Sequence, residues 1–450
     1  MRLGRGSILG FTLAAVVAVP AAIAPAGADD DEAPVVLTAV DRSSGPEQDP
    51  AQVAARVDSL AKSKKMGDNA GTLIIDAETG RPLYDDDGGL ALIPASTNKI
   101  PTAAALLHYG GPNRTLQTRV TTSGTDIYLV GGGDPLLTSR KVKARPGEPV
   151  YPRPTSLRQL AADTAAALRT QGSATVALRV DDSLFEGPAW EPTWPEYYRT
   201  QGIVAPVSAL IVDDGRVGGE WGPIAEDPAI AAGDVFADLL KARGVKVSGV
   251  KRDRSPETAQ EIASVSSAPV YEMVGQSLNT SDNQTAENLF RLAGRYAGFG
   301  GSFDGGGKAV TKALEEMGVS TVMSSFRDGS GLSREDRLTP NLLTELLRRV
   351  VRAQDGLWPI ASGLAVAGVS GTLEGRFRTI QTEPAAGWLR GKTGTLNYVS
   401  SLAGFVQSES GRMLAFASIA NDAKSPFEAA AQIDEMMAAA AACGCPGNSR

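Results

Sequence analysis

Three short polar motifs occur along this chain in a fixed order, and they constrain its fold more than any other feature. The first is Ser-x-x-Lys at 96–99, the second is Ser-Asp-Asn at 281–283, and the third is Lys-Thr-Gly at 392–394. Each motif alone is common by chance, but the ordered set is specific because three different chemistries must occur in sequence. We expect a fold that brings these distant segments to one cleft.

The first motif pairs a serine with a lysine one helical turn later. Side chains three positions apart share a helix face, so Lys99 can reach the Ser96 hydroxyl. A serine hydroxyl is a weak nucleophile until a base takes its proton. Because the chain holds a single histidine, His108, and no G-x-S-x-G motif accompanies it, the sequence predicts Lys99 as the base for a nucleophilic Ser96.

Lysine is a base only when neutral, and its ordinary pKa of about 10.4 keeps it charged in water. Burial and a nearby cation both lower the pKa of a lysine, and Lys392 supplies that cation if the third motif lines the same cleft. We also expect Ser96 at a helix N-terminus, where backbone N–H groups favour developing negative charge. Pro101 predicts a slight kink or a loosened first turn in that helix.

Two other segments imitate the motifs. Residues 59–62 also read Ser-x-x-Lys, but they lie in a charged stretch with no strand before them, so we interpret them as a solvated helix face. Residues 277–279 form a second Ser-x-Asn. Because Leu278 belongs to an apolar series, Ser281 is preferred over Ser277, which stays open as an alternative.

The N-terminus has the pattern of a secretory signal peptide. Arg2 and Arg5 precede an apolar stretch, and Ala-Gly-Ala at 26–28 forms a cleavage site. The alternative is an uncleaved membrane anchor, since apolar and small residues nearly reach the length of about 20 needed to span a bilayer. We expect cleavage near Ala28 and a secreted, extracytoplasmic protein of the periplasm or cell wall.

The amino-acid composition excludes several classes of binding partner. The formal net charge of −7 argues against nucleic acid and offers no basic patch for anionic lipid. Cys443, Cys445 and one histidine supply too few ligands for a structural zinc site, so no metal or cofactor is expected. The redox state of the two cysteines stays open.

Hydrophobic patterning predicts strands near both chain ends and helices between them. Thr339 and Pro340 form an N-cap and first-turn pair that opens one of these helices. Strands are expected at 71–76, 82–84, 398–407 and 412–420, and an alanine-rich helix is expected at 427–442. The pattern predicts one sheet built from both termini, with helix-rich sequence as its other layer.

The stretch between the first two motifs is too long for one helical subdomain. Alternating strand and helix patterns in it predict a small α/β insert. The resulting division is a signal peptide at 1–28, a flexible lead-in at 29–52, a first domain part at 53–110, the insert at 111–255, a second domain part at 256–442 and a tail at 443–450.

Several other features receive a structural interpretation. Asp134 is read as a turn aspartate, and the glycine-rich loop 328–333 as a cleft wall. The glycines at 298–307 lack the order of a phosphate-binding loop, so nucleotide binding is not expected. The aromatic residues at 185–198 are read as pinning a loop onto a domain, with a sugar-stacking platform as the alternative.

Taken with their neighbours, the motifs resemble those of the class C low-molecular-mass penicillin-binding proteins, the DacB-type D-alanyl-D-alanine carboxypeptidase/endopeptidases of bacterial cell walls. The segments that carry the resemblance are 94–99, 128–135, 281–289, 328–334 and 391–395. The resemblance implies an α/β (α+β) fold. In that fold a serine β-lactamase/transpeptidase-like domain, with helices on a mainly antiparallel sheet, is interrupted by the insert. Members can carry a third domain within the insertion, for which the present insert is too short.

The resemblance also implies roles. The catalytic residues would be Ser96, Lys99, Ser281 and Asn283, and the substrate-binding residues would be Lys392, Thr393, Gly394 and Thr395. Backbone N–H groups of Ser96 and Thr395 would form the oxyanion hole. The implied partners are peptidoglycan stem peptides, with β-lactam antibiotics as covalent inhibitors at Ser96, and no cofactor is implied.

Two other classes stay open on the sequence. A serine β-lactamase shares the three motifs but needs a glutamate-activated deacylating water, and no convincing E-x-x-L-N string lies between the second and third motifs. A non-catalytic cell-wall scaffold on the same fold is the second alternative, for which intact motifs are a poor match.

Overall fold

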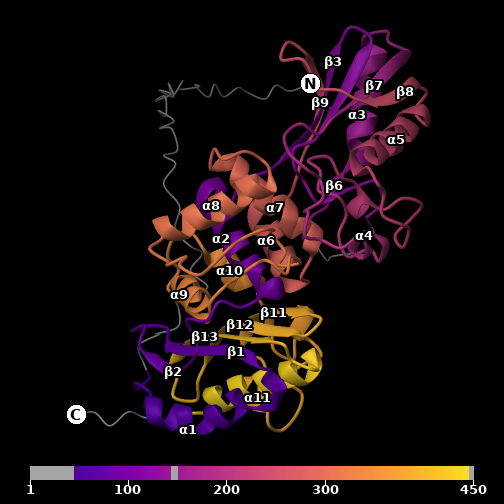
Figure 1. The fold of residues 1–450 in the computed structure, drawn as a ribbon. Helices are drawn as coiled ribbons and strands as arrows, with labels where there is room; N and C mark the ends of the chain where they lie inside the picture. Colours follow the sequence, from indigo (N-terminus) through magenta and orange to yellow (C-terminus); the bar gives the residue numbers. More distant parts are fainter. Residues whose placement is uncertain (1–44, 143–149, 445–450) are drawn as a thin grey trace, which may run out of the picture. The chain divides into compact units, whose positions relative to one another are not determined.

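The computed structural model describes residues 45–142 and 150–444 (Figure 1). Its main sheet has six antiparallel strands in the order β10-β11-β12-β13-β1-β2. They are β1 (Asn69–Asp76), β2 (Pro82–Asp86), β10 (Ala365–Val366), β11 (Arg390–Leu396), β12 (Val399–Gln407) and β13 (Met413–Asn421). Strand β1 pairs with β13 along its whole length, from Asn69 opposite Asn421 to Asp76 opposite Leu414. Both ends of the chain therefore build one sheet, as the patterning predicts.

Helices cover both faces of this sheet (Figure 1). On one face lie α1 (Pro50–Ala61) and α11 (Pro426–Ala441), which share a buried core with strand residues such as Ile74 and Phe416. On the other face lie α2 (Lys99–Gly110), α6 (Val270–Asn279), α7 (Asn283–Tyr296), α8 (Phe303–Glu316), α9 (Pro340–Val351) and α10 (Trp358–Gly363). Thr339 caps α9 by accepting from the Leu342 N–H at 3.1 Å, as its sequence predicts.

Glycines allow α7 and α8 to approach closely. A Cβ atom on Gly306 would lie 2.4 Å from Phe290 Cδ1, and one on Gly294 would lie 2.5 Å from the Gly300 carbonyl oxygen. Real Cβ atoms do not occupy such positions, so larger residues would force the helices apart. The glycine-rich stretch is therefore a helix-packing device.

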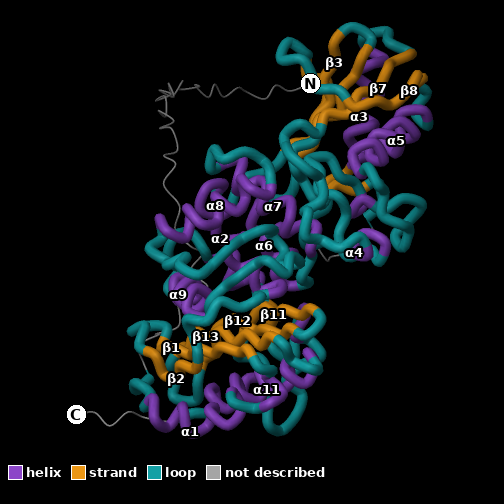
Figure 2. Tube along the Cα trace, in the orientation of Figure 1, coloured by secondary structure: helices purple, strands orange, loops and turns teal. Residues whose placement is uncertain are grey.

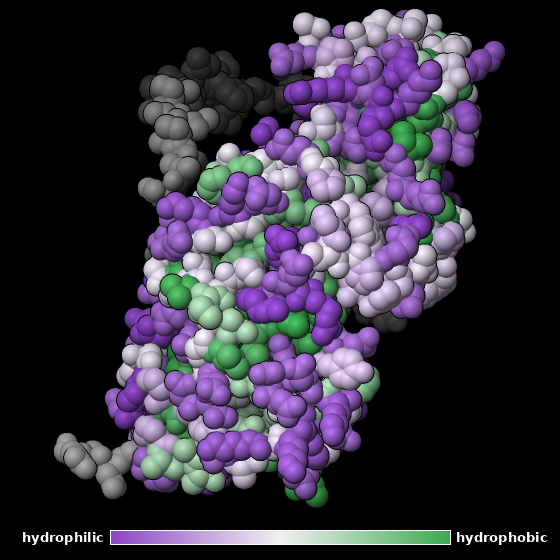
Figure 3. Space-filling view, viewed as in Figure 1, coloured by the Kyte–Doolittle hydropathy of each residue, from purple (hydrophilic) through white to green (hydrophobic). Residues whose placement is uncertain are grey.

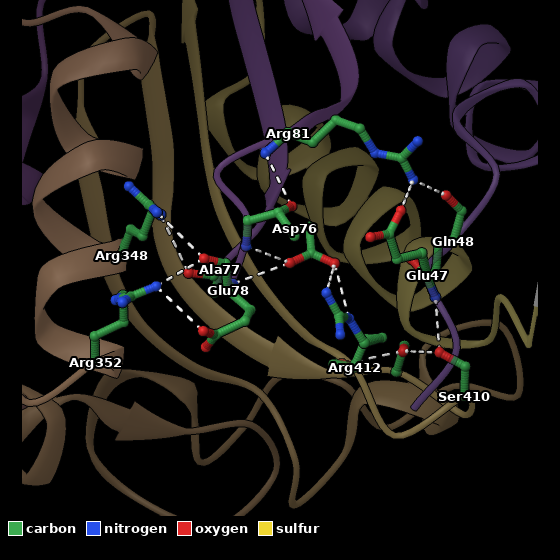
Figure 4. Close-up of polar contacts among 12 residues, drawn as sticks. Glu47, Gln48, Asp76, Ala77, Glu78, Arg81, Arg348, Arg352, Ser410 and Arg412 are labelled. Carbon is green, nitrogen blue, oxygen red and sulfur yellow. Dashed lines mark hydrogen bonds and ion pairs between the residues drawn. The ribbon is translucent and has the colours of Figure 1, made fainter. Parts of the chain in front are cut away.

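A buried ion pair between Asp76 and Arg412 lies where β1 ends, and more exposed arginines make further polar contacts around it (Figure 4). The Asp76 carboxylate at the end of β1 accepts from Arg412 Nε at 2.8 Å and from the Glu78 N–H at 2.9 Å. Arg348 of α9 donates to the Ala77 carbonyl at 3.2 Å. These contacts tie the β1–β2 turn to the β12–β13 hairpin and to α9.

The insert contains a second sheet of five strands, in the order β8-β7-β4-β3-β9. Its strands are β3 (Gln117–Ser123), β4 (Asp126–Val130), β7 (Thr175–Asp181), β8 (Lys246–Arg252) and β9 (Gln260–Ser266). Strands β4, β7 and β8 are parallel, and helices α3 (Leu157–Thr170) and α5 (Pro228–Lys241) share a core with them. The sheet takes in β9, beyond residue 255, because β9 pairs with β3.

The rest of the insert is mostly loop (Figure 2). It includes β5 (Leu137–Thr138), β6 (Thr155–Ser156) and the short α4 (Tyr197–Thr200). Asp134 accepts from the Leu136 N–H at 2.8 Å and from the Thr155 hydroxyl, so it is a turn aspartate as predicted.

The face drawn in Figure 3 is mainly hydrophilic. No helix among the described residues is long and apolar enough to cross a membrane. Cys443 is buried, whereas Cys445 and the predicted signal peptide lie outside the described residues.

Candidate active site

The three motifs meet where β11 passes the start of α2. Ser96 lies in a 3₁₀ turn, Ala95–Asn98, which leads directly into α2. The preceding residue, Ala95, has a φ of +47°, a left-handed backbone that presents Ser96 on a tight turn. Pro101 is the third residue of α2, where a proline costs no intrahelical hydrogen bond. The predicted loosened first turn is therefore the 3₁₀ segment that carries Ser96.

Lys99 is buried, with 1% of its surface exposed, and its Nζ has three hydrogen-bond partners. They are Ser96 Oγ at 2.9 Å, Asn283 Oδ1 at 2.8 Å and the Ser330 carbonyl oxygen at 2.9 Å. The first and second motifs thus meet at this nitrogen. The third partner belongs to the glycine-rich loop that the sequence predicts as a cleft wall.

These partners fix the direction of the amine. The Asn283 amide is oriented by its Nδ2, which donates to the Ile203 carbonyl at 3.1 Å, so its oxygen faces Lys99. That oxygen and the Ser330 carbonyl can only accept. A neutral lysine has two N–H groups and one lone pair, so the two acceptors take the N–H groups and the lone pair points at the Ser96 hydroxyl.

Burial makes the neutral form of Lys99 accessible. Desolvation lowers its pKa to about 8, against the opposing charges of Glu287, Asp328 and Asp282, which raise it. The sequence predicts burial and the Lys392 charge as joint causes. In the structure burial is the cause that lowers the pKa of Lys99, and the repulsion between the two lysines lowers the pKa of Lys392 instead.

Lys392 is the second buried lysine of the site. Its Nζ donates to Ser281 Oγ at 2.9 Å and to the Thr393 carbonyl at 2.8 Å. Burial, followed by the Lys99 charge, lowers the pKa of Lys392 well below its ordinary value. The Ser277 alternative lies elsewhere: its hydroxyl donates to the Asp282 carbonyl at 3.5 Å, so Ser281 is the serine that meets the third motif.

A glycine lets β11 approach the nucleophile. A Cβ atom on Gly394 would lie 2.9 Å from the Ser96 nitrogen and 2.2 Å from Ser401 Oγ. Ser401 Oγ in turn donates to the Pro94 carbonyl at 2.7 Å, which holds the turn against the sheet. The next residue, Thr395, is exposed. The backbone N–H groups of Ser96 and Thr395 therefore belong to two segments in close contact.

The remaining third-motif residue is Thr393, whose hydroxyl donates to Thr372 Oγ1 at 2.8 Å. All eight predicted site residues thus lie on the three segments that converge here: the 3₁₀ turn with α2, the residues that lead into α7 together with its first residue, and β11.

The sequence did not identify the carboxylates behind Lys99. Glu287, fully buried on α7, accepts from the N–H groups of Gly329 at 3.0 Å and Ser330 at 2.7 Å. Burial raises the pKa of Glu287 to about 8. Asp328 is also fully buried and accepts from Gly331 N–H at 2.6 Å. An acidic residue inside the apolar series of a helix is the one signal that points to Glu287.

Comparisons with known proteins match most of this chain to one family of peptidases. Residues 53–226 and 221–442 match the D-Ala-D-Ala carboxypeptidase 3 (S13) family. Carboxypeptidase Rv3627c of Mycobacterium tuberculosis is 35% identical over 381 residues, 83% of this chain and 80% of its own. Carboxypeptidase DacB of Mycolicibacterium smegmatis is 33% identical over 438 residues, 96% and 91% of the two chains. The crystal structure of penicillin-binding protein 4 (dacB) from Haemophilus influenzae, 22% identical, covers 85% of this chain and 98% of its own with a TM-score of 0.69, which shows a shared fold.

Proposed function

This chain belongs to the D-Ala-D-Ala carboxypeptidase 3 (S13) family, and from that premise we propose the part that each site residue plays. Membership confirms the resemblance carried by the motifs and makes the chain a serine-type D-Ala-D-Ala carboxypeptidase that acts on peptidoglycan. One observation carries the proposed roles. Lys99 Nζ lies 2.9 Å from Ser96 Oγ, while its two other partners are oxygens that can only accept.

Acylation begins when Ser96 Oγ attacks the carbonyl carbon between the two terminal D-alanines. A bond forms between Oγ and that carbon, and neutral Lys99 takes the hydroxyl proton along its 2.9 Å contact. The carbonyl oxygen becomes an oxyanion, which accepts from the backbone N–H groups of Ser96 and Thr395. Each such donor is typically worth about 3 kcal/mol in the transition state.

The leaving group then departs. The C–N bond breaks, and the D-alanine nitrogen receives a proton from the Ser281 hydroxyl, which is replenished by the proton that Lys99 gained. Lys392, 2.9 Å from Ser281 Oγ, holds this hydroxyl in place. Water then adds to the Ser96 ester, releases the shortened peptide and restores the serine hydroxyl.

Lys392 also attracts the substrate's terminal carboxylate. A bound carboxylate favours the charged form of a lysine, so substrate binding offsets the burial that lowers the pKa of Lys392. The hydroxyls of Thr393 and Thr395 donate to the same carboxylate, and Asn283 Nδ2, which meets the Ile203 carbonyl in the free enzyme, donates to the substrate amide.

β-Lactams are the proposed covalent inhibitors. The Haemophilus influenzae homologue has been solved in complex with a β-lactam. An opened β-lactam ring stays attached to the acyl group, so the fragment occupies the place of the departed D-alanine and blocks the hydrolytic water at Ser96.

Intact-mass measurement after incubation with a penicillin tests these roles. We expect one adduct on the wild type, none on Ser96→Ala, and an unchanged adduct on the control Ser59→Ala. A wild type that forms no adduct at any concentration would contradict the proposal. Rapid turnover of nitrocefin would favour the β-lactamase alternative.

The substrate range and the location of the enzyme are also part of the proposal. We propose that it is exported after cleavage near Ala28 and that it acts on cross-linked as well as free stem peptides. N-terminal sequencing of the secreted protein is expected to start at Asp29. Incubation with purified muropeptides, scored for released D-alanine against cleaved cross-links, separates carboxypeptidase from endopeptidase action.

A further inference from the structure

We infer that Asp328 is a positioning residue for the catalytic lysine, and that Trp194 of the insert holds Asp328 in place. The inference rests on the proposed function, because it assumes that Lys99 is the base. It assigns the insert a direct part in building the site, through a chain of hydrogen bonds that runs from an indole to the Ser96–Lys99 pair.

A single peptide unit links Asp328 to Lys99. The Ser330 carbonyl accepts from Lys99 Nζ at 2.9 Å. The N–H on the other side of the same peptide bond, that of Gly331, donates to Asp328 Oδ1 at 2.6 Å. Because a peptide unit is planar, fixing its N–H fixes the direction of its carbonyl. Asp328 therefore aims the oxygen that takes one of the two Lys99 N–H groups.

The second carboxylate oxygen connects Asp328 to the insert. Asp328 Oδ2 accepts from Trp194 Nε1 at 2.7 Å and from the Ser333 N–H at 2.6 Å. The Trp194 ring is buried and packs edge-on against Phe303 and Trp190, with ring centroids 5.4 and 5.1 Å apart. The aromatic stretch thus pins its own loop onto the main domain, as its sequence predicts, and Trp194 makes this contact at the carboxylate of Asp328.

The main chain of this loop is also tied to the segment that carries the lysine. Asn98 Nδ2 donates to the Asp328 carbonyl at 2.7 Å, and the Thr102 hydroxyl donates to the Gly329 carbonyl at 2.8 Å. The loop and the start of α2 therefore form one hydrogen-bonded unit. A shift of Asp328 would move the Ser330 carbonyl away from Lys99 Nζ. The Lys99 N–H that donates to this carbonyl would then lose its acceptor.

The charged groups around Lys99 and Asp328 determine how the acylation rate depends on pH. Lys99 faces the carboxylates of Glu287 and Asp328 and that of Asp282 at the start of α7, and it interacts with the Lys392 ammonium. Asp328 interacts with the carboxylates of Asp336, Glu287 and Glu191. Removing the Asp328 charge removes one of the influences that raise the pKa of Lys99.

Rates of acylation by a fluorescent penicillin, measured across pH, test the inference with two variants and a control. Trp194→Phe loses the indole N–H but keeps an aromatic ring; we expect its plateau rate to fall about tenfold with its acid limb in place. Asp328→Asn places an amide group against the N–H donors that the carboxylate now accepts from, so we expect the plateau acylation rate to fall about a hundredfold. It also removes a negative charge near Lys99, so we expect the acid limb of the pH profile to move to lower pH. The control is Trp221→Phe on the same insert, 90% exposed, which is expected to match the wild type.

Each outcome decides one question. A Trp194→Phe enzyme that acylates at the wild-type rate, or an Asp328→Asn enzyme whose acid limb stays in place, overturns the inference. If Trp194→Phe lowers the melting temperature, the acid limb of Asp328→Asn decides alone, since loss of folded protein lowers a plateau without moving a limb. A wild type that is not acylated contradicts the proposed function instead.

Discussion

The chain contains the Ser-x-x-Lys spacing twice, and the two copies have opposite electrostatics. At 59–62 the serine is exposed on α1, and Lys62, with 60% of its side chain exposed, pairs with Asp58 at 2.7 Å. That hydrogen bond raises the pKa of Lys62. At 96–99 the lysine is buried and its pKa falls to about 8. The three-residue spacing lets the lysine reach the serine in both copies. Only burial and the surrounding hydrogen-bond acceptors make the lysine at 96–99 able to act as a base.

The largest loss of activity is expected when Ser96 or Lys99 of the buried copy is replaced. Ser96→Ala and Lys99→Ala are each expected to lower the rate of D-alanine release by about 10⁴-fold or more, because nucleophile and base act as a unit. Release of D-alanine from a pentapeptide substrate measures this loss.

The exposed copy supplies the matched controls. Ser59→Ala and Lys62→Ala are expected to keep wild-type rates, since both side chains lie at the surface of α1. A Lys99→Ala enzyme that retained the wild-type rate would show that burial of the motif lysine has no catalytic meaning.

The next largest effect is expected from a change at the close contact between β11 and the turn that carries Ser96. The copy at 59–62 has no such contact with β11. Gly394→Ala places a Cβ atom 2.9 Å from the Ser96 nitrogen and 2.8 Å from the Pro94 carbonyl. The strand or the turn must shift, and we expect kcat/KM to fall by about 10²- to 10³-fold, the range for loss of an oxyanion donor. Acylation by a penicillin measures the change.

A strand glycine elsewhere controls for the substitution itself. A Cβ atom on Gly249 of β8 would meet no atom within 4 Å, so Gly249→Ala is expected to leave the rate unchanged. Equal rates for Gly394→Ala and the wild type would remove the steric reason for glycine in the third motif.

Much of the main domain could be predicted from the sequence because its strands are apolar and bounded by turns. The predicted strands at 71–76, 398–407 and 412–420 fall within one or two residues of β1, β12 and β13. The sequence does not predict β9 as part of the insert, because the predicted insert ends at residue 255. Residues of β9 are half-buried or exposed along its length, so the strand carries no alternating hydrophobic pattern and is defined by its pairing with β3.

The residues of the active site also differ in how well the sequence predicts them. Side-chain chemistry at fixed spacing identifies Ser96, Lys99 and Lys392, because the residue types themselves carry the signal. The Ser330 carbonyl carries none, since any residue has a carbonyl and only the loop's position makes it a partner of Lys99. Asp328 looks like an ordinary loop aspartate until the fold places Trp194 beside it.

The pH dependence sharpens the contrast between the two lysines. Lys99 is a base only when neutral, and protonation below its pKa of about 8 removes that form. We expect the acylation rate to rise with pH up to about 8, then level, with about a tenfold loss for each unit below it. A profile that is flat through pH 8 would contradict Lys99 as the base.

The smallest effect concerns the exposed pair itself. Lys62→Met removes the ion pair with Asp58, but water screens two exposed charges and each side chain gains rotational freedom when the pair is lost. We expect the melting temperature and the acylation rate to match the wild type, and added salt to leave the difference near zero. If Lys62→Met lowered acylation as much as Lys99→Ala is expected to, the three-residue spacing alone would explain the motif. The contrast between a solvated and a buried lysine would then no longer account for which serine reacts.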